Sequence, residues 1–247
     1  MFRTFWGIVK RDGKTVNLSR EDSRNLYDLG ELYHDFSIFG FKTKQPPGIF
    51  GPNQRCKAPI INAYIQLAIA KSKSSMSDTV TFAELFCADG YYAMVARLFG
   101  AMKSYGIDRD EQWLEKARKI ADKIGLTNIE FVKEDVNNID RLERVDVVAN
   151  VGGLYHVPNP EEILTKSYNM AKKYLIVQSV VSMANDSPDY FETPAPGWTW
   201  GCRFNKVSFQ KMIERLGYEV VDYHFNELEG NDRLEDRGSV YYLIKVK

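Results

Sequence analysis

The sequence is poor in cysteine, in long apolar runs and in net charge. Its three cysteines, Cys56, Cys87 and Cys202, are far apart and lack the spacing of a zinc site or a disulfide framework. No run approaches the roughly 20 apolar residues of a membrane span, and the first 14 residues lack a signal-peptide pattern. The 33 basic residues balance 33 acidic ones, which disfavours binding to nucleic acid or to a membrane surface. We therefore expect a folded cytoplasmic protein without a metal that acts on a small molecule, and the oligomeric state stays open.

A polar, serine-rich stretch at residues 71–78 divides the chain into two predicted units. Residues 1–78 contain two groups of apolar residues at helical spacing, around positions 26–33 and 61–69, with a proline- and glycine-rich loop at residues 44–52 between them. This pattern predicts an N-terminal helical cap. Residues 79–247 are predicted to form the main domain.

The main domain has the pattern of an α/β fold. Short apolar runs alternate with amphipathic segments, as in βαβ units wound around a parallel sheet. The last two runs follow each other without a helix between them, which predicts an antiparallel final strand. We predict a Rossmann-like, seven-stranded, mostly parallel sheet with strands near residues 80–85, 102–107, 129–132, 145–151, 174–179, 219–224 and 240–246.

The turn after the first predicted strand, Glu84-Leu-Phe-Cys-Ala-Asp-Gly-Tyr-Tyr92, is the main candidate for ligand binding. At this position an open parallel sheet presents backbone amides to a ligand. A dinucleotide fingerprint needs three glycines, and only Gly90 is present, so NAD binding is disfavoured. The turn resembles motif I of the class I S-adenosylmethionine-dependent methyltransferases, in which an acidic residue and a glycine-rich turn hold the methionine part of the cofactor. Phe86 and Ala88 replace glycines of that motif.

The resemblance continues in the family's order through the next three strands. It implies that Asp108, at the end of the second strand, binds the ribose hydroxyls, and that Asp135, after the third, recognises the adenine amino group. The fourth strand and the turn that follows it, residues 146–156, resemble the segment that faces the reacting methyl group. The implied cofactor is S-adenosylmethionine, with S-adenosylhomocysteine as product, held by Glu84, Phe86, Ala88, Gly90, Asp108, Arg109, Asp135, Val136 and Asn150.

His156 is the candidate catalytic base, because it follows the fourth strand directly. A neutral imidazole with a pKa of about 6.5 suits removal of a proton from a hydroxyl acceptor. The alternative is a structural histidine that hydrogen-bonds a backbone carbonyl. Tyr155 is its neighbour and a second candidate.

The segment 182–203 is long for a connection and rich in aromatic residues, which is typical of a binding loop. Trp198 and Trp200 could instead form a strand-like pair with one indole buried. Arg203 and Arg55 are candidates for an anionic acceptor, although either fits a surface charge equally well. The predicted acceptor-binding residues are Tyr155, Tyr190, Trp198, Trp200, Arg203 and Arg55.

The resemblance implies methyl transfer, and we expect an oxygen of a small-molecule or carbohydrate-like acceptor to receive the methyl group. Residues 154–160 and 193–201 look more loosely like bacterial methyltransferases of polysaccharide and capsule modification. A tRNA nucleoside methyltransferase is one alternative, against which the balanced charge counts. A non-catalytic S-adenosylmethionine-binding module is another, because the glycine turn is altered.

Overall fold

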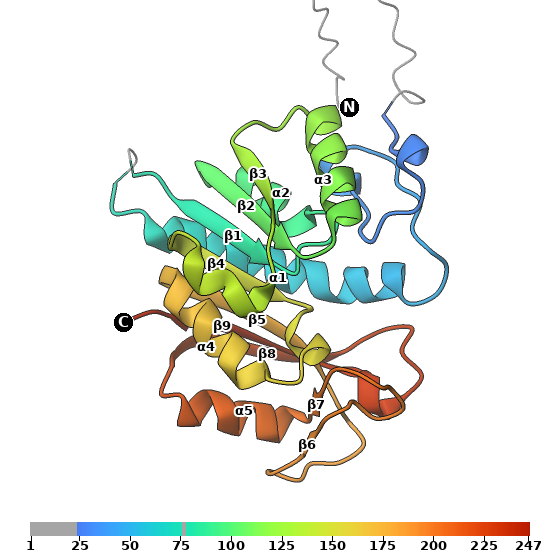
Figure 1. The fold of residues 1–247 in the computed structure, drawn as a ribbon, viewed down its shortest axis with the longest axis vertical. Coiled ribbons are helices and arrows are strands. Elements are labelled where there is room, and N and C mark those ends of the chain that lie inside the picture. Colours follow the sequence, from blue (N-terminus) through green and yellow to red (C-terminus); the bar gives the residue numbers. More distant parts are fainter. Residues whose placement is uncertain (1–23, 76–77) are drawn as a thin grey trace, which may run out of the picture.

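The computed structural model describes residues 24–75 and 78–247, and its centre is a seven-stranded sheet in the order β3-β2-β1-β4-β5-β9-β8 (Figure 1). Strands β1 to β5 pair in parallel, and β9 is antiparallel to both β5 and β8. The predicted sheet is thereby confirmed, although β5 and β8 extend several residues beyond the predicted runs. The strands are β1 (Thr81–Leu85), β2 (Lys103–Asp108), β3 (Ile129–Lys133), β4 (Val145–Val151), β5 (Ala171–Val181), β8 (Glu219–Glu227) and β9 (Gly238–Lys245).

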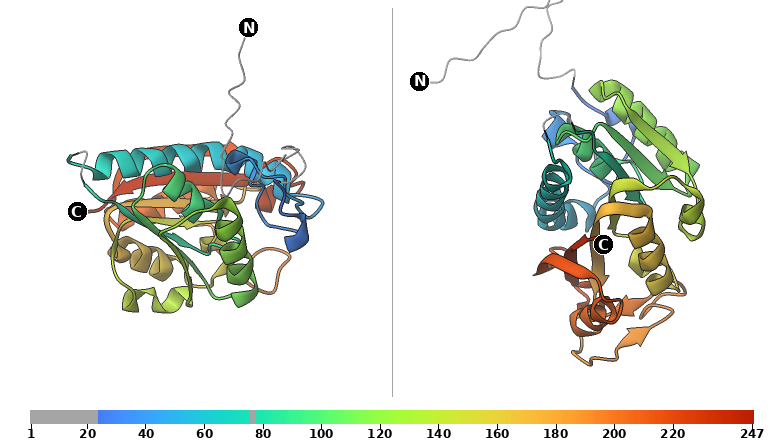
Figure 2. Two further views of the ribbon diagram at one scale, coloured as in Figure 1. Left: turned by 90° about the horizontal axis from the view of Figure 1, so that it is seen from above. Right: turned by 90° about the vertical axis from the view of Figure 1, so that its left-hand side faces the viewer.

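Helices cover both faces of this sheet, because successive side chains of a buried strand point to opposite sides. Phe82 of β1 belongs to one apolar cluster and its neighbour Ala83 to the other. Figure 2 shows the two layers of helices. The first cluster includes α1 (Phe50–Ser72), α2 (Tyr91–Leu98) and α3 (Glu111–Ile124), and the second includes α4 (Pro160–Met170) and α5 (Lys206–Arg215).

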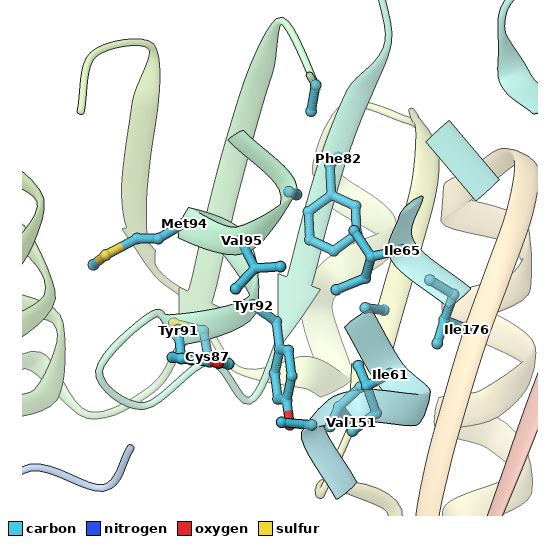
Figure 3. Close-up of a cluster of buried hydrophobic side chains, with 14 of the residues drawn as sticks. Ile61, Ile65, Phe82, Cys87, Tyr91, Tyr92, Met94, Val95, Val151 and Ile176 are labelled. Carbon is cyan, nitrogen blue, oxygen red and sulfur yellow. The ribbon is translucent and has the colours of Figure 1, made fainter. Parts of the chain in front are cut away.

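The long helix α1 is packed directly on the sheet. Ile61, Ile65 and Ala68 recur at helical spacing, are fully buried, and belong to the same cluster as Phe82. Figure 3 shows Ile61 and Ile65 beside Phe82, Tyr92 and other side chains of this cluster. The N-terminal region therefore shares its core with the main domain, and a division of the chain at residue 78 stays a prediction.

Two local predictions for the N-terminal region are wrong. The helix expected around residues 26–33 is a single 3-10 turn, Tyr27–Leu29, which ends at Gly30 with a positive φ of 72°. The loop expected at residues 44–52 ends early, because α1 begins at Phe50. The first 14 residues, and residues 76–77 of the predicted linker, lie outside the described part of the chain. Among the described helices, none is long and apolar enough to cross a membrane.

The aromatic segment between β5 and α5 forms a small second sheet. Its strands β6 (Phe191–Glu192) and β7 (Arg203–Phe204) are antiparallel. This pair holds the loop that carries Trp198 and Trp200 beside the carboxyl end of β4, where Cys202 N–H donates to the carbonyl of Tyr155 at 3.0 Å.

Candidate active site

A cavity of about 640 Å³ opens at the carboxyl ends of the parallel strands. Its volume lies within the range of about 300–1,000 Å³ that is usual for small-molecule sites. The turn after β1, the ends of β2 and β4, the turn after β3, the N-terminal segment and α1 all contribute to its wall. Lining residues include Tyr33, His34, Lys57, Glu84, Phe86, Ala88, Asp108, Arg109, Trp113, Asp135, Val136, Gly152, His156 and Trp200.

The turn after β1 has the backbone of a glycine-rich loop without most of its glycines. Phe86, Ala88 and Gly90 all have positive φ, at 58°, 46° and 77°. For an L-residue this left-handed conformation costs roughly 1–2 kcal/mol, which glycine avoids. The surrounding structure therefore holds Phe86 and Ala88 in a conformation that their side chains disfavour.

Close packing fixes the side chains of this turn. The Phe86 ring fills the place where a side chain at Gly153 would stand, since a Cβ there would lie 2.5 Å from the ring's Cγ and closer still to Cδ2 and Cε2. Gly90 faces the Phe131 ring in the same way, because a Cβ at position 90 would lie 2.9 Å from Cζ of that ring. Gly90 thus permits close packing and does not itself line the cavity.

Two carboxylates anchor the turn. Glu84 is 2% exposed and accepts a hydrogen bond from the Ala93 amide of α2 at 2.7 Å. Its burial raises the pKa of this carboxyl well above the usual value. Asp108 accepts from the Ala88 amide at 2.9 Å and from the Asp110 amide at 3.0 Å. Both acids therefore shape the turn while they line the cavity.

The ends of β2 and β3 form an acidic side of the cavity. Asp135 accepts hydrogen bonds from the backbone and side-chain amides of Asn137, at 2.9 and 2.7 Å. These hydrogen bonds and the nearby charge of Arg109 lower the pKa of Asp135, while partial desolvation raises it. The net result is a pKa below the usual value. An ionised carboxylate is the acceptor that ribose hydroxyls and an adenine amino group require. Asp108 and Asp135 therefore fit the adenosine part of S-adenosylmethionine.

Asn150 does not reach this site. It is fully buried, and its side-chain amide donates to the Ser167 hydroxyl of α4 at 2.9 Å. Of the nine predicted cofactor residues, the structure brings all but Gly90 and Asn150 to the cavity wall.

His156 and Trp200 form the opposite side of the cavity. Their rings are stacked, with centroids 5.0 Å apart and planes 13° from parallel. The His156 side chain stays open to the cavity, but desolvation by its surroundings and the charges of Arg203, Arg109 and Lys57 lower its pKa to about 4. The pKa therefore lies below the expected value of about 6.5, first because the ring is desolvated and second because three cations from distant parts of the chain lie near it.

The other predicted acceptor residues are dispersed. Trp198 packs against Trp200, with ring centroids 5.1 Å apart, but does not line the cavity. The Tyr155 ring lies against the Arg203 guanidinium, whose Cζ is 5.5 Å from the ring centroid.

Neither predicted arginine reaches the cavity wall. Arg203 is 4% exposed and pairs with Asp236 at 2.6 Å. Arg55 is exposed and lies 3.4 Å from Glu229. Tyr190 lines a neighbouring hollow of about 730 Å³ between α4, α5 and the aromatic segment, and its hydroxyl donates to Glu192 at 2.7 Å. That hollow lies away from the carboxylates of the turn, so the smaller cavity is the better candidate for chemistry.

The N-terminal region supplies wall residues that the sequence did not predict. His34 is 7% exposed, and its backbone amide donates to the fully buried Asp89 carboxylate at 2.8 Å, while its ring Nδ1 lies 2.5 Å from the same group. Tyr33 lies beside it. Lys57 enters from α1, four residues before Ile61, so the helical spacing of the apolar face could have identified it as a buried lysine.

Comparisons with known proteins identify this architecture. Residues 76–221 match the family model described as a methyltransferase domain. The chain therefore belongs to the methyltransferase-domain family, of the class I S-adenosylmethionine-dependent type. A search of curated proteins found no match.

Three solved structures share the fold at low identity. The N-terminal domain of EvdMO1, in the presence of S-adenosylhomocysteine and D-fucose, is 16% identical with a TM-score of 0.62, over 89% of this chain and 93% of that one. The magnesium protoporphyrin IX methyltransferase ChlM from Synechocystis PCC 6803 is 12% identical with a TM-score of 0.60, over 79% and 86%. The [4+2]-cyclase SpnF is 14% identical with a TM-score of 0.55, over 75% and 80%. Likeness at this level shows the fold alone.

Proposed function

We propose that this protein transfers the methyl group of S-adenosylmethionine to a hydroxyl of a small, sugar-like acceptor. When bound, the cofactor supplies an electrophilic methyl group on a positively charged sulfur. Asp108 and Asp135 orient its adenosine part, and the turn after β1 lies against the rest. The observation that carries the proposal is the continuity of one cavity from these carboxylates to the His156–Trp200 pair.

The acceptor side has the character of a carbohydrate site. Trp200 is 42% exposed and presents an indole face beside His156, and Tyr33 adds further aromatic surface. Aromatic side chains supply a large apolar contact area together with a polar edge, which suits a sugar ring. A solved relative of the same fold was crystallised with D-fucose, which supports this choice of acceptor class.

His156 is proposed to position the acceptor by a hydrogen bond and not as a charged group. His156 is neutral at physiological pH, because its pKa of about 4 is well below 7. It is therefore suited to hydrogen-bond a neighbouring hydroxyl of the acceptor, and we propose it as a residue that orients the acceptor in the site. Modification of a bacterial polysaccharide, or of its sugar precursors, in the cytoplasm is the setting that we favour.

A transfer assay tests this function directly. The full-length protein is incubated with S-adenosylmethionine carrying a labelled methyl group and with a panel of monosaccharides and nucleotide sugars, D-fucose included, beside bulk tRNA. We expect label on at least one sugar hydroxyl and none on tRNA. Label on tRNA alone would establish the nucleoside methyltransferase alternative, and tight S-adenosylhomocysteine binding without transfer to any acceptor would establish the non-catalytic one.

A further inference from the structure

Lys57 is a buried lysine of α1. The residue is 8% exposed and lines the same cavity as His156. Within residues 24–75 and 78–247, its ammonium group makes no hydrogen bond or ion pair. Withdrawal of this side chain from solvent disfavours the charged form of the amine. The amine therefore lies in the cavity, in surroundings that favour its neutral form.

The position of α1 places Lys57 at the acceptor side. This helix packs against α2, β4, β5 and β9, and β4 lies on the far side of β1 from β2 and β3. Asp108 ends β2 and Asp135 follows β3, whereas His156 follows β4. Lys57 is also one of the charges that lower the pKa of His156. The amine therefore lies towards the end of the cavity where transfer takes place.

The protonation of Lys57 is set by its surroundings. Burial lowers its pKa to about 8, against a small opposing effect of Cys56. The other titratable groups that line the cavity are Tyr33, His34, Glu84, Tyr92, Asp108, Arg109, Asp110, Glu134, Asp135 and His156. A positively charged sulfonium in the same cavity would favour the neutral amine further. A base is most effective when its pKa is near the working pH, and Lys57 meets this condition far better than His156 does.

We propose that Lys57 Nζ removes the proton from the acceptor hydroxyl during methyl transfer. This assignment rests on the proposed function. The acceptor oxygen forms a bond to the methyl carbon as the bond from carbon to sulfur breaks and leaves its electron pair on sulfur. The hydroxyl proton moves to Nζ, so that one positive charge disappears at sulfur and one appears on the lysine.

The proximity of Lys57 to sulfur can be tested without an acceptor. S-Adenosylmethionine carries the sulfonium charge and S-adenosylhomocysteine does not. A protonated Lys57 should therefore repel only S-adenosylmethionine and weaken its binding. The affinity of each is measured by calorimetry at about pH 6.5 and about pH 9. In wild type, we expect the preference for S-adenosylmethionine to rise about three- to tenfold with pH, as for a pKa shift of up to about one unit.

Two variants isolate the source of this effect. Lys57→Met should lose the rise, while His156→Gln should keep it; the titration of the cofactor's own amino group is common to all three proteins. Lys57→Met removes an unpaired buried charge, so it should fold at least as stably as wild type in a thermal melt. A preference that is independent of pH in wild type would overturn the proposal. An equal loss of both affinities in Lys57→Met would also overturn it, because Lys57 would then bind the carboxylate that both molecules share.

Turnover supplies the second readout. On the acceptor found in the transfer panel, Lys57→Met should lose about 100-fold or more in kcat with little change in KM. Lys57→Arg should not restore the rate, because a guanidinium stays protonated at this pH. If Lys57→Arg were as active as wild type, charge alone would suffice and the proposal would fail. Failure of both cofactor forms to bind would instead refute the proposed function.

Discussion

The ring of Phe86 occupies the space that a side chain at Gly153 would need. Phe86 belongs to the turn after β1, and Gly153 follows β4, the neighbouring strand. A bulky residue at a position where the family has glycine is thus accommodated by a glycine on the facing segment. The turn after β1 and the turn after β4 are therefore packed against each other.

Gly153→Ala should separate these loops. Gly153 has an ordinary φ of −107°, so the change introduces a clash without backbone strain. We expect a loss of about 1–3 kcal/mol in the free energy of unfolding, as for overpacking of a core, together with weaker binding of S-adenosylhomocysteine. Chemical denaturation and calorimetry measure the two effects. The double variant Gly153→Ala/Phe86→Ala removes the clash, so a double variant that recovers no stability would contradict this explanation.

Ala88→Gly should be neutral or stabilising. At φ 46° alanine carries roughly 1–2 kcal/mol of strain, and glycine costs about 0.5–1 kcal/mol in entropy, so the net gain is between zero and about 1.5 kcal/mol. The matched control is Ala96→Gly within α2, where the same change should destabilise by about 1 kcal/mol. Thermal unfolding that moves in the same direction for both variants would show that the turn is unstrained.

Asp108→Asn should weaken S-adenosylhomocysteine binding by about 1.5–3 kcal/mol, the value of hydrogen bonds to a charged group. The carboxylate is an acceptor for the Ala88 and Asp110 amides, and the amide side chain replaces one acceptor oxygen with a donor. Calorimetric titration of the folded variant checks the affinity. The control is Asp140→Asn, an exposed carboxylate 3.9 Å from Lys166, which should bind normally; equal weakening in the control would point to a general charge effect.

Acid should destabilise the wild type more than His156→Gln. The pKa of His156 is about 4 in the folded protein and about 6.5 when unfolded, so between these values the unfolded chain binds the extra proton. This contribution to stability is complete above about pH 6.5 and is lost as the pH falls towards 4. Denaturant unfolding at several pH values over this range provides the comparison. Parallel stability curves for the two proteins would mean that the pKa of His156 is ordinary.

Trp200→Ala should raise the KM for the acceptor about tenfold or more, with little effect on cofactor affinity, because loss of a buried aromatic contact costs about 1.4 kcal/mol or more. Trp198 is equally exposed and packs on Trp200, but it lies off the cavity wall. Trp198→Ala should therefore have a distinctly smaller effect on KM. The same KM for both variants would show that the two indole rings contribute equally to acceptor binding.

The sequence predicts those parts of the site that are encoded locally. Glu84, Asp108 and Asp135 stand at the ends of apolar strand runs, and parallel strands bring such ends to one edge of a sheet. The partners of Arg203 and His34 are not encoded locally. Asp236 is 33 residues away from Arg203, and Asp89 is 55 residues away from His34. The 3-10 turn that leads to His34 has no helical period that would place it against the sheet.

Local sequence patterns also could not predict the pKa of His156 or the orientation of Asn150. The pKa of His156 depends first on desolvation of the ring and then on Arg203, Arg109 and Lys57, which come from three separate parts of the fold. Asn150 stands at a position where the resemblance implies a cofactor contact, yet its side chain faces α4, where its Nδ2 donates to the Ser167 hydroxyl.

The packing of α1 on the sheet has a practical consequence for expression of the catalytic region alone. A protein that begins at residue 76, where the match to the family model begins, would leave Phe82 and its neighbours without the cover of Ile61, Ile65 and Ala68. It would also leave the Asp89 carboxylate without His34. Such a fragment should aggregate on purification, so the smallest useful unit for crystallisation or engineering includes residues 24–72.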